Sequence, residues 1–435
     1  MNLDNLKSLL CDYGCKTIYV KKLAPNDNSK NQVYLGGSFD ILNIFPTSEI
    51  ISVPAGDWKK DRFKASINFF WITEERQLSR AAEAQLILYP KYPEVRFSGF
   101  LKGCSKAPSD LMASRGIDRF LFLSATNDGR VLGYVIDSKS ELYHEFLTLT
   151  DLRTHGVFYI IEIENQLDNR KRLLTEMLRI HQLGWIDSKM LNPAGKTIPC
   201  QASHCGGYTL EAELGVTPNG FSEPDYFGYE MKQFHARSFE HYRSEVLTLM
   251  TPEPTGGYYS VAGVEAFIRK YGYPDKNGVP DRLNFGGIHK VGCKHSTTNL
   301  ELSLLGFDYV TGKILNSDGE ICLIDNNGDY AASWSFASLL KHWNRKHNMA
   351  CYVPSQTLKE PKLQYRYGNN LIMGSGTSFI LFLNQMHLGN IYYDPGIKLE
   401  NSSTKPKTKR RSQFRIKSEF LKELYYSSEF INLLI

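Results

Sequence analysis

The segment 223–232, EPDYFGYEMK, contains the residue types that metal-dependent hydrolysis of a phosphodiester requires. Glu230 and Lys232 are two positions apart, so their side chains leave the same face of a strand. Asp225 stands at the entrance of that strand, because Pro224 cannot continue a hydrogen-bonded ladder. Carboxylate oxygens suit Mg²⁺, and a neighbouring ammonium can hold or help deprotonate the attacking water. The segment therefore predicts a magnesium-dependent phosphodiesterase site.

Two flanking features extend this pattern. Glu211 lies in GGYTLEAELGV, which predicts a short helix between glycines, and it offers a third carboxylate to the same metal. A solvated helix face is the alternative interpretation of Glu211. After the strand, Gln233, His235 and Arg237 are hydrogen-bonding and basic residues that suit a passing phosphate backbone.

A second part of the chain has a similar pattern. Asp128, followed by Asp137-Ser-Lys139, also has two carboxylates and a lysine and fits the pattern when the spacing between the carboxylates is allowed to vary. Because such patterns with variable spacing arise by chance in a chain of this length, spacing alone does not decide between the two. Asp128 belongs to an Asn-Asp-Gly turn, which is a sufficient structural reason for its presence. We therefore favour 223–232.

The segment GGYTLEAELGVTPNGFSEPDYFGYEMKQ resembles the active-site region of the MvaI/BcnI family of type II restriction endonucleases, which is similar to the nicking repair enzyme MutH. The match includes the glutamate in TLE, the Pro-Asn-Gly turn at 218–220, and Asp with Glu-x-Lys in the PD-(D/E)xK pattern. The resemblance implies catalytic roles for Glu211, Asp225, Glu230 and Lys232, with the first three around Mg²⁺. It also implies a monomer that cleaves double-stranded DNA at specific sites and leaves a 5′-phosphate.

The expected fold is a mixed α/β (α+β) architecture in two domains. Residues 1–190 form an N-terminal α+β domain that we interpret as a DNA-binding or specificity module. Residues 195–435 form the nuclease domain, whose family fold implies a restriction-endonuclease-like core with a DNA-recognition lobe. Pro and Gly cluster in LNPAGKTIPC after a helix expected over 169–183, which predicts a boundary between 165 and 200.

Several apolar runs predict individual elements. In the first domain SINFFWIT, AQLILYPKY and EVRFSGFL are expected strands, and RFLFLSAT-NDGR-VLGYVID is a hairpin signature. In the second domain DYFGYEMKQF, ICLIDN, MACYVP, LIMGS and FILFL are expected strands. The stretch 400–417 predicts a basic loop, and SEFLKELYYSSEFINLL after it predicts an amphipathic helix.

Basic residues of the second domain are candidates for contact with DNA, with solvated surface cations as the alternative. The run from Lys405 to Lys417 contains seven Lys or Arg and no acidic residue, which would make binding strongly salt-dependent. The candidates in this run and in DRLNFGGIHKVGCKH and HWNRKH are Arg282, Lys290, Lys294, His295, Arg345, Lys346, Lys409, Arg410 and Arg411.

Composition bears on the binding partner, the location and the cysteines of the protein. The 435 residues have a formal charge of only +5, so an anionic partner is permitted but not demanded. No window approaches eighteen consecutive apolar residues and no secretory leader is evident, which predicts a cytoplasmic protein with free thiols. Cys200, His204 and Cys205 lack a fourth ligand for structural zinc.

Three hypotheses remain open from the sequence. A site-specific restriction endonuclease, with a cognate DNA methyltransferase as a partner in the same system, is favoured. A strand-nicking repair nuclease similar to MutH would use the same chemistry. A DNA-binding protein without catalytic activity would use 223–232 only as a surface hairpin with ordinary ion pairing.

Overall fold

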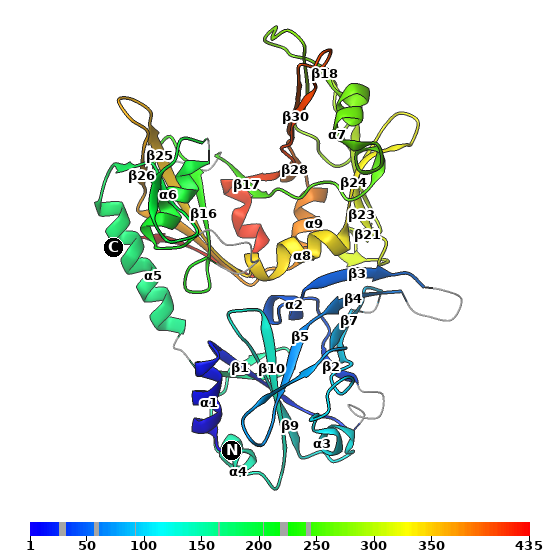
Figure 1. The fold of residues 1–435 in the computed structure, drawn as a ribbon, viewed down its shortest axis with the longest axis vertical. Helices are drawn as coiled ribbons and strands as arrows, with labels where there is room; N and C mark the ends of the chain where they lie inside the picture. Colours follow the sequence, from blue (N-terminus) through cyan, green and yellow to red (C-terminus); the bar gives the residue numbers. More distant parts are fainter. Residues whose placement is uncertain are drawn as a thin grey trace. The chain divides into compact units, whose positions relative to one another are not determined.

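The chain divides into two compact units, Met1–Asn169 and Arg170–Ile435 (Figure 1). The structure is a computed structural model and describes residues 1–25, 32–55, 61–91, 93–163, 166–202, 204–217, 225–240 and 245–435, without the side chains of 166–168, 341, 344 and 345. The Pro-Asn-Gly turn expected at 218–220, and Pro224, lie outside the described residues.

In the described residues the first unit is built on two sheets. The larger sheet has the strand order β11 (Thr154–His155), β12 (Phe158–Glu162), β1 (Thr17–Lys22), β9 (Arg119–Ala125), β10 (Arg130–Asp137), β5 (Asn68–Ile72) and β6 (Leu78–Ala81). The smaller sheet has the order β2 (Gln32–Gly36), β8 (Glu94–Ser98), β7 (Gln85–Tyr89), β4 (Arg62–Ser66) and β3 (Glu49–Val53). The helices are α1 (Leu3–Asp12), α2 (Ile41–Ile44), α3 (Ser109–Ala113) and α4 (Glu141–Leu147).

Alternating apolar residues explain the core of this unit. Phe120 and Phe122 of β9 are two positions apart, so they leave one face of the sheet, where Leu6 of α1 and Phe146 of α4 pack on them. β9 and β10 pair antiparallel around the Asn-Asp-Gly turn, which confirms the hairpin expected there.

The central sheet of the second unit has the order β13 (Ile186–Asp187), β26 (Gln364–Tyr367), β25 (Met349–Leu358), β27 (Asn370–Ser375) and β32 (Ser427–Asn432). β16 (Glu230–His235) joins it by pairing parallel to β25. α5 (Gln166–Gln182) and α6 (Cys205–Glu213) pack against it, with β14 (Lys189–Leu191) and β15 (Thr197–Pro199) as a separate hairpin.

The division between units precedes the expected 190/195 division because α5 belongs to the second core. Leu173, Met177 and Ile180 of α5 are buried in one cluster with Met231 and Val353 of the central sheet. This spacing places one apolar stripe of α5 on the sheet. The helix therefore begins the second unit instead of ending the first.

The remainder of the second unit contains smaller sheets and three further helices. The strands are β17 (Val246–Met250), β31 (Phe414–Lys417) and β28 (Ile391–Tyr393); β18 (Tyr273–Pro274), β19 (Arg282–Gly286), β29 (Gly396–Glu400) and β30 (Lys407–Lys409); β20 (Glu301–Leu305), β23 (Glu320–Ile324) and β24 (Tyr330–Ser335); β21 (Phe307–Asp308) and β22 (Lys313–Ile314). The helices are α7 (Gly257–Tyr271), α8 (Phe336–His347) and α9 (Phe379–His387), with a 3₁₀ helix, η1, at Ser418–Leu424.

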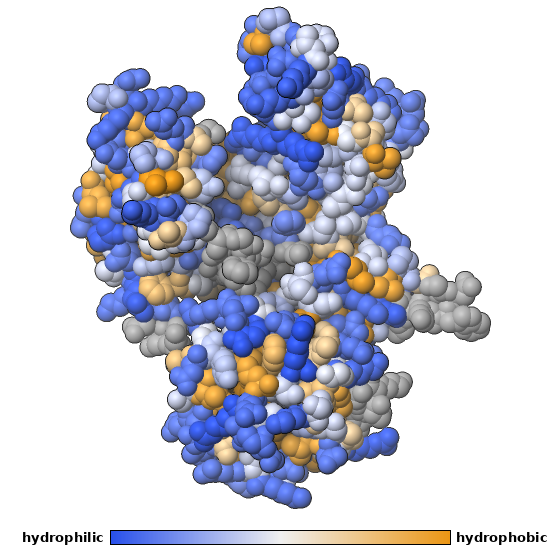
Figure 2. All heavy atoms as spheres, in the orientation of Figure 1, coloured by the Kyte–Doolittle hydropathy of each residue, from blue (hydrophilic) through white to orange (hydrophobic). Residues whose placement is uncertain are grey.

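Two lobes result within this unit. In Figure 1 α7, β18, β28 and β30 form one lobe, apart from the lobe with α6, β16, β25 and β26. Figure 2 shows the surface hollowed between these two lobes, with hydrophilic side chains along the hollow.

Two expected elements are wrong. FILFL forms the first turns of α9, because Ser378 accepts a hydrogen bond from the Ile380 amide and caps a helix. In a short, continuous apolar run the spacing of apolar residues does not distinguish a buried strand from a buried helix. The expected C-terminal amphipathic helix is instead η1 followed by β32, which takes its hydrogen bonds from β27.

The basic stretch is also more ordered than expected. Lys407–Lys409 pairs with β29 as β30, and Phe414–Lys417 is the middle strand between β17 and β28. Phe414 and Ile416 are buried and anchor that strand. Only part of 405–417 therefore lies outside sheet structure.

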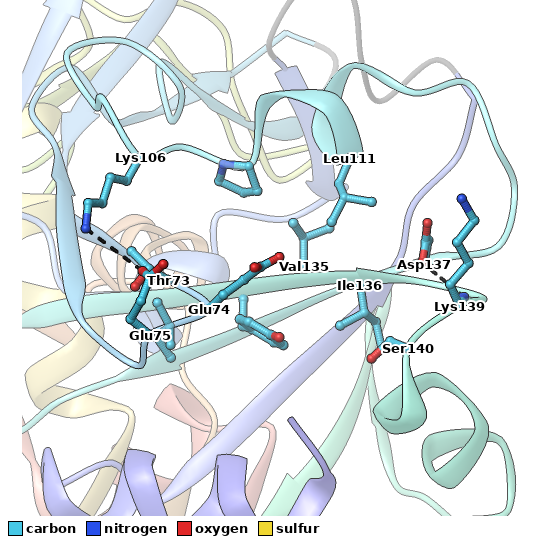
Figure 3. A pocket seen from close by; sticks show the side chains of 13 residues that line it. Thr73, Glu74, Glu75, Lys106, Leu111, Val135, Ile136, Asp137, Lys139 and Ser140 are labelled. Carbon is cyan, nitrogen blue, oxygen red and sulfur yellow. Dashed lines mark hydrogen bonds and ion pairs between the residues drawn. The ribbon is translucent and has the colours of Figure 1, made fainter.

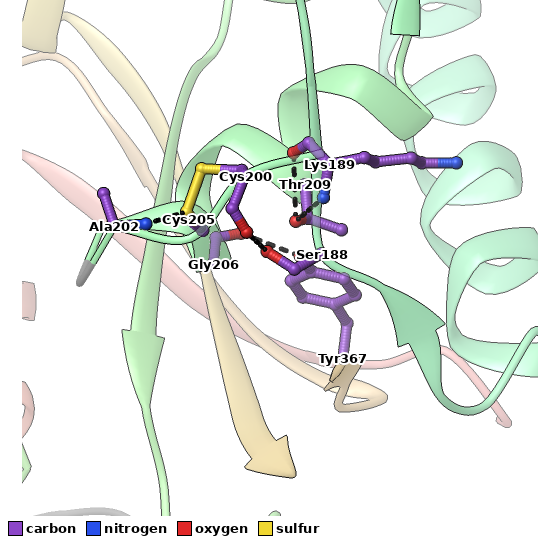
Figure 4. The surroundings of a disulfide bond; sticks show 8 residues. All are labelled: Ser188, Lys189, Cys200, Ala202, Cys205, Gly206, Thr209 and Tyr367. Atoms are coloured by element: carbon purple, nitrogen blue, oxygen red, sulfur yellow. Dashed lines mark hydrogen bonds between the residues drawn. A yellow bond between two sulfur atoms is a disulfide. The ribbon is translucent and has the colours of Figure 1, made fainter. Parts of the chain in front are cut away.

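Cys200 and Cys205 form a disulfide, which corrects the expectation of free thiols at these two positions. Figure 4 shows it at the start of α6, where the Ser188 hydroxyl donates to the carbonyl of Cys200 (2.7 Å) and the Tyr367 hydroxyl to the carbonyl of Gly206 (2.7 Å). Because the two sulfurs bond to each other, this group does not form a zinc site. No helix among the described residues is long and apolar enough to cross a membrane.

Candidate active site

A tight turn places Asp225 beside the strand that follows it. Tyr226 and Tyr229 exchange two backbone hydrogen bonds (3.0 and 2.9 Å), and Phe227 and Gly228 between them have φ of 48° and 86°. Two successive positive φ angles are the signature of a hairpin turn that reverses the chain. The strand expected from Asp225 onward therefore begins only at Glu230.

The reversal returns the Asp225 carboxylate to the start of β16. Its Oδ2 accepts a hydrogen bond from the backbone amide of Met231 at 2.9 Å. The side chain is thus held by the strand that also presents Glu230 and Lys232.

β16 carries the other two groups of the motif on one face. Glu230 and Lys232 alternate with the buried Met231, which packs into the core on the opposite face. The Lys232 Nζ donates to Glu230 Oε1 at 2.7 Å. Glu230 is only 2 % exposed, and its buried Oε2 accepts no hydrogen bond from the described residues.

α6 supplies the third carboxylate. Leu210 and Leu214, four positions apart, are buried in the core with Met231 and thereby fix the rotation of the helix. Glu211 then faces the charged groups: burial first, and then repulsion from Asp225 and Glu230, raise its pKa to about 7. Glu211 is thus partly buried and does not lie on a fully solvated helix face.

Asp225, like Glu211, has a raised pKa. Burial, followed by repulsion from Glu230, raises the pKa of Asp225 to about 6, although the Met231 amide favours its ionised form. Desolvation together with a like charge nearby is the arrangement that distinguishes functional carboxylates from ordinary surface ones. A cation would relieve both effects.

Lys346 joins this cluster from a distant part of the sequence. Its Nζ lies 3.4 Å from Glu230 Oε1. Burial opposes its charge, but attraction by Glu230, Asp225 and Glu211 raises the pKa of Lys346 above its ordinary value. From the sequence Lys346 is expected among the DNA contacts; in the fold it lies at the carboxylates.

The donor chemistry fits a hard divalent cation. Three carboxylates converge, and the buried Oε2 of Glu230 is left without a donor. As the side chains lie, no group of three or more His, Cys, Asp or Glu among the described residues is arranged to hold a metal ion. Glu230 Oε1 is taken by two lysines, so ligation would involve the remaining oxygens.

The second motif is not assembled. Asp128 pairs with Arg130 (2.8 Å) at the start of β10, whereas Asp137 is the last residue of that strand. A strand of this length separates the two carboxylates by roughly 20 Å. Asp137 Oδ1 instead accepts from the Lys139 amide (3.0 Å), beside a pocket lined also by Glu74, Glu75 and Lys106 (Figure 3).

The candidate DNA contacts that follow β16 differ in what they touch. Gln233 Nε2 donates to the Ser355 hydroxyl at 2.6 Å, which ties it to β25. His235 and Arg237 are exposed at the end of the strand.

The remaining candidates fall into paired and exposed groups. Arg282 and Lys409 both pair with Glu400 (3.0 and 3.1 Å), so neither cation is simply solvated. His295 stacks on the buried His289. The exposed side chains are those of Lys290, Lys294, Lys409, Arg410 and Arg411, and the side chain of Arg345 lies outside the described part of α8.

Comparison with known proteins identifies the family. The model of the MvaI/BcnI restriction endonuclease family matches residues 174–425, more than half of the chain. The chain belongs to the MvaI/BcnI restriction endonuclease family. It is thus a type II restriction endonuclease, a site-specific DNA endonuclease, and the resemblance seen in the sequence is confirmed. No curated protein matches the chain.

Two solved structures of the endonuclease MvaI are similar to part of the chain. The complex of MvaI with cognate DNA has 19 % identity and a TM-score of 0.45, and covers 60 % of this chain and 97 % of that one. MvaI in the absence of DNA has 18 % identity and a TM-score of 0.34, and covers 61 % and 98 %. The family match begins within α5, so it leaves the first unit unassigned.

Proposed function

We propose that this family member is a Mg²⁺-dependent endonuclease whose active site consists of Glu211, Asp225, Glu230 and Lys232. The observation that carries the proposal is the convergence of three carboxylates and an ammonium from α6, the turn before β16, and β16 itself. The raised pKa values of Glu211 and Asp225 reflect burial first and then the negative charge of neighbouring carboxylates, which a divalent cation would neutralise.

In this proposal the carboxylates hold the cation and Lys232 acts on the nucleophile. Bound there, Mg²⁺ would polarise the scissile phosphate and stabilise the charge that develops on its oxygens. Lys232, held by Glu230, donates a hydrogen bond to the attacking water and orients it in line with the leaving 3′-oxygen. Cleavage at that bond leaves a 5′-phosphate.

The exposed basic residues of the second unit would hold the DNA backbone along the hollow between its two lobes. His235 and Arg237 extend directly from the catalytic strand, and Arg410, Arg411 and Lys409 belong to the β29–β30 region of the other lobe. Exposed cations close to phosphates give a binding energy that falls with salt.

The first unit, outside the family match, is proposed to be a DNA-binding or specificity module. We propose further that the enzyme is a monomer in the cytoplasm, where its substrate DNA lies, and that a cognate DNA methyltransferase protects the same sites.

The deciding experiment incubates the purified full chain with supercoiled, unmethylated plasmid in Mg²⁺ or in EDTA. We expect discrete linear fragments in Mg²⁺, none in EDTA, and none from Asp225→Ala. The matched control is Asp137→Ala, which alters the unassembled second motif and should cut like the wild type. Sequencing the fragment ends gives the target site.

Two outcomes would contradict the proposal. Open circles that never become linear at the end-point would indicate a strand-nicking repair nuclease, as in MutH. DNA binding that is indifferent to Mg²⁺, with no cleavage of several methylated and unmethylated DNAs, would indicate a binding protein.

A further inference from the structure

Lys346 brings a second ammonium to the cluster from outside the motif. Its Nζ lies 3.4 Å from the same Glu230 Oε1 that Lys232 contacts at 2.7 Å. Glu230 is 2 % exposed, whereas the side chains of Lys232 and Lys346 are 23 % and 33 % exposed. Two half-buried cations thus share one oxygen of a buried carboxylate.

The order of elements explains why this lysine reaches the site. Only His347 and Asn348 separate Lys346 from β25, which begins at Met349. Ala350 of β25 is the register partner of Glu230 in the parallel pair with β16. The last turn of α8 therefore comes out beside the first residue of the catalytic strand.

Aromatic packing fixes that last turn. Trp343 and His347, one helical turn apart and both buried, stack with their ring centres 4.4 Å apart. Trp343 also packs on Phe382 of α9 at 4.8 Å. Lys346 thus extends from a rigid part of the helix, which suits a side chain with a geometric task.

We infer that Lys346 is a positioning residue of the nuclease site. Together with Lys232 it holds Glu230 Oε1, so that the orphaned Oε2 is the oxygen left for a cation, and its charge offsets the repulsion among the three carboxylates. This inference rests on the proposed function of the cluster and adds to it a residue that the Asp-x4-Glu-x-Lys pattern does not contain.

The two parts of this role predict opposite effects of removing the charge. Without Lys346 a divalent cation meets less positive charge and binds more tightly. Glu230 at the same time loses one of the two donors that orient it, so the cleavage step becomes slower. A residue needed only for folding would weaken binding and slow cleavage together.

The test compares Lys346→Gln with the wild type in two assays. Calorimetric titration with Ca²⁺, without DNA, should give about threefold tighter binding for Lys346→Gln, because one nearby charge is removed. Single-turnover cleavage of a plasmid in saturating Mg²⁺ should be slower by about tenfold or more, because the reacting groups are misplaced.

Two further variants control for charge and for general effects. Lys346→Arg keeps the charge, so we expect its Ca²⁺ affinity within about twofold of the wild type and at least about a third of the rate. Lys362→Gln removes a lysine that pairs with Asp187 at the surface (2.6 Å), and it should match the wild type in both assays.

Three results would overturn the inference: cleavage by Lys346→Gln at the wild-type rate, weaker Ca²⁺ binding together with slower cleavage, or a loss in Lys346→Arg as large as in Lys346→Gln. If Lys346→Gln shows no cooperative thermal transition, it is not folded, and the cleavage rate of Lys346→Arg then decides: the rate expected above supports the inference, and a lower rate contradicts it. Asp225→Ala is measured in parallel. If Asp225→Ala still cuts DNA, the proposed function fails. If Asp225→Ala is inactive but Lys346→Gln cuts at the wild-type rate, only the role of Lys346 is refuted.

Discussion

The two Asp/Glu-x-Lys segments of this chain show how little sequence spacing says about distance. Around Asp225 a two-residue turn folds the chain back, so that the aspartate accepts from the strand that carries Glu230. Around Asp128 the turn leads into a long strand, and Asp137 is carried to its far end. Equivalent residue types thus form a charge cluster in one region and separate surface groups in the other.

The electrostatics of the two regions differ in the same sense. Burial and neighbouring carboxylates raise the pKa values of Glu211 and Asp225, whereas the hydrogen bond from Arg130 lowers the pKa of Asp128. The first pattern is unfavourable for the isolated protein and would be relieved by a bound cation, while the second is an ordinary ion pair. Paired substitutions in the two regions can therefore test the distinction.

The largest difference is expected between the two lysines. Lys232→Ala should slow single-turnover cleavage by about a thousandfold while DNA binding in Ca²⁺ is largely retained, because a group that acts on the nucleophile is lost. Lys139→Ala should cut like the wild type. Gel-shift and plasmid assays measure both, and an active Lys232→Ala enzyme would remove the basis for distinguishing the regions.

The pH dependence should be the next largest effect. Between pH 8 and pH 6 Glu211, with a pKa of about 7, becomes largely protonated, and Asp225, with a pKa of about 6, becomes half protonated, so the affinity of the cluster for a cation falls. At limiting Mg²⁺ we expect cleavage to fall by about tenfold to twentyfold over this range. Rate measurements at pH 6, 7 and 8 test this, and saturating Mg²⁺ should restore much of the loss. A rate independent of pH at limiting Mg²⁺ would contradict the assignment.

Two glycines allow the turns to be compared directly. Gly228 and Gly129 both have positive φ (86° and 83°), so alanine strains each turn by about 1 kcal/mol. A Cβ on Gly228 would also meet the Met349 side chain at 3.2 Å, whereas a Cβ on Gly129 meets nothing within 4 Å. Gly228→Ala should displace Asp225 and slow cleavage by several-fold to about tenfold.

Gly129→Ala is the control for this substitution. It should lower the melting temperature without changing the cleavage rate by more than about twofold, since its turn belongs to the first unit and carries no residue of the charge cluster. Equal rates for the two alanine variants would show that the position of Asp225 does not depend on its turn.

The smallest expected effect is on stability without metal. The pKa of Glu211 is raised in the folded protein above its ordinary 4.5. Its favourable contribution to the free energy of unfolding is therefore present at low pH and is lost as the pH rises through about 7. Glu211→Gln should thus stabilise the metal-free protein at pH 8, by about 1 kcal/mol or somewhat more.

Asp128→Asn should act in the opposite direction. The pKa of Asp128 is lowered in the folded protein, so its ionised form stabilises the fold at neutral pH. Asp128→Asn should therefore lower the free energy of unfolding, by less than about 1 kcal/mol for such an exposed pair. Urea unfolding in EDTA measures both variants. Destabilisation by Glu211→Gln at pH 8 would mean that Glu211 is a structural residue.

The sequence by itself determined the residue types of the site and most of the local structure. Alternation identified β16, the apolar stripe of α5 and the Leu210–Leu214 pair identified the helices, and the Asn-Asp-Gly turn identified the β9–β10 hairpin. These features depend on neighbours within a few positions, which a sequence displays directly. The family resemblance likewise depended on a contiguous segment.

Tertiary structure alone decided which charges meet. The α9 helix was mistaken for a strand because an apolar run takes its conformation from its cap and its packing, and the last predicted helix became β32 because β27 offers a hydrogen-bonding edge. The place of Lys346 beside Glu230 follows from the parallel pairing of β16 with β25 across more than a hundred residues. Such pairing reflects the burial of whole faces, and no local pattern encodes it.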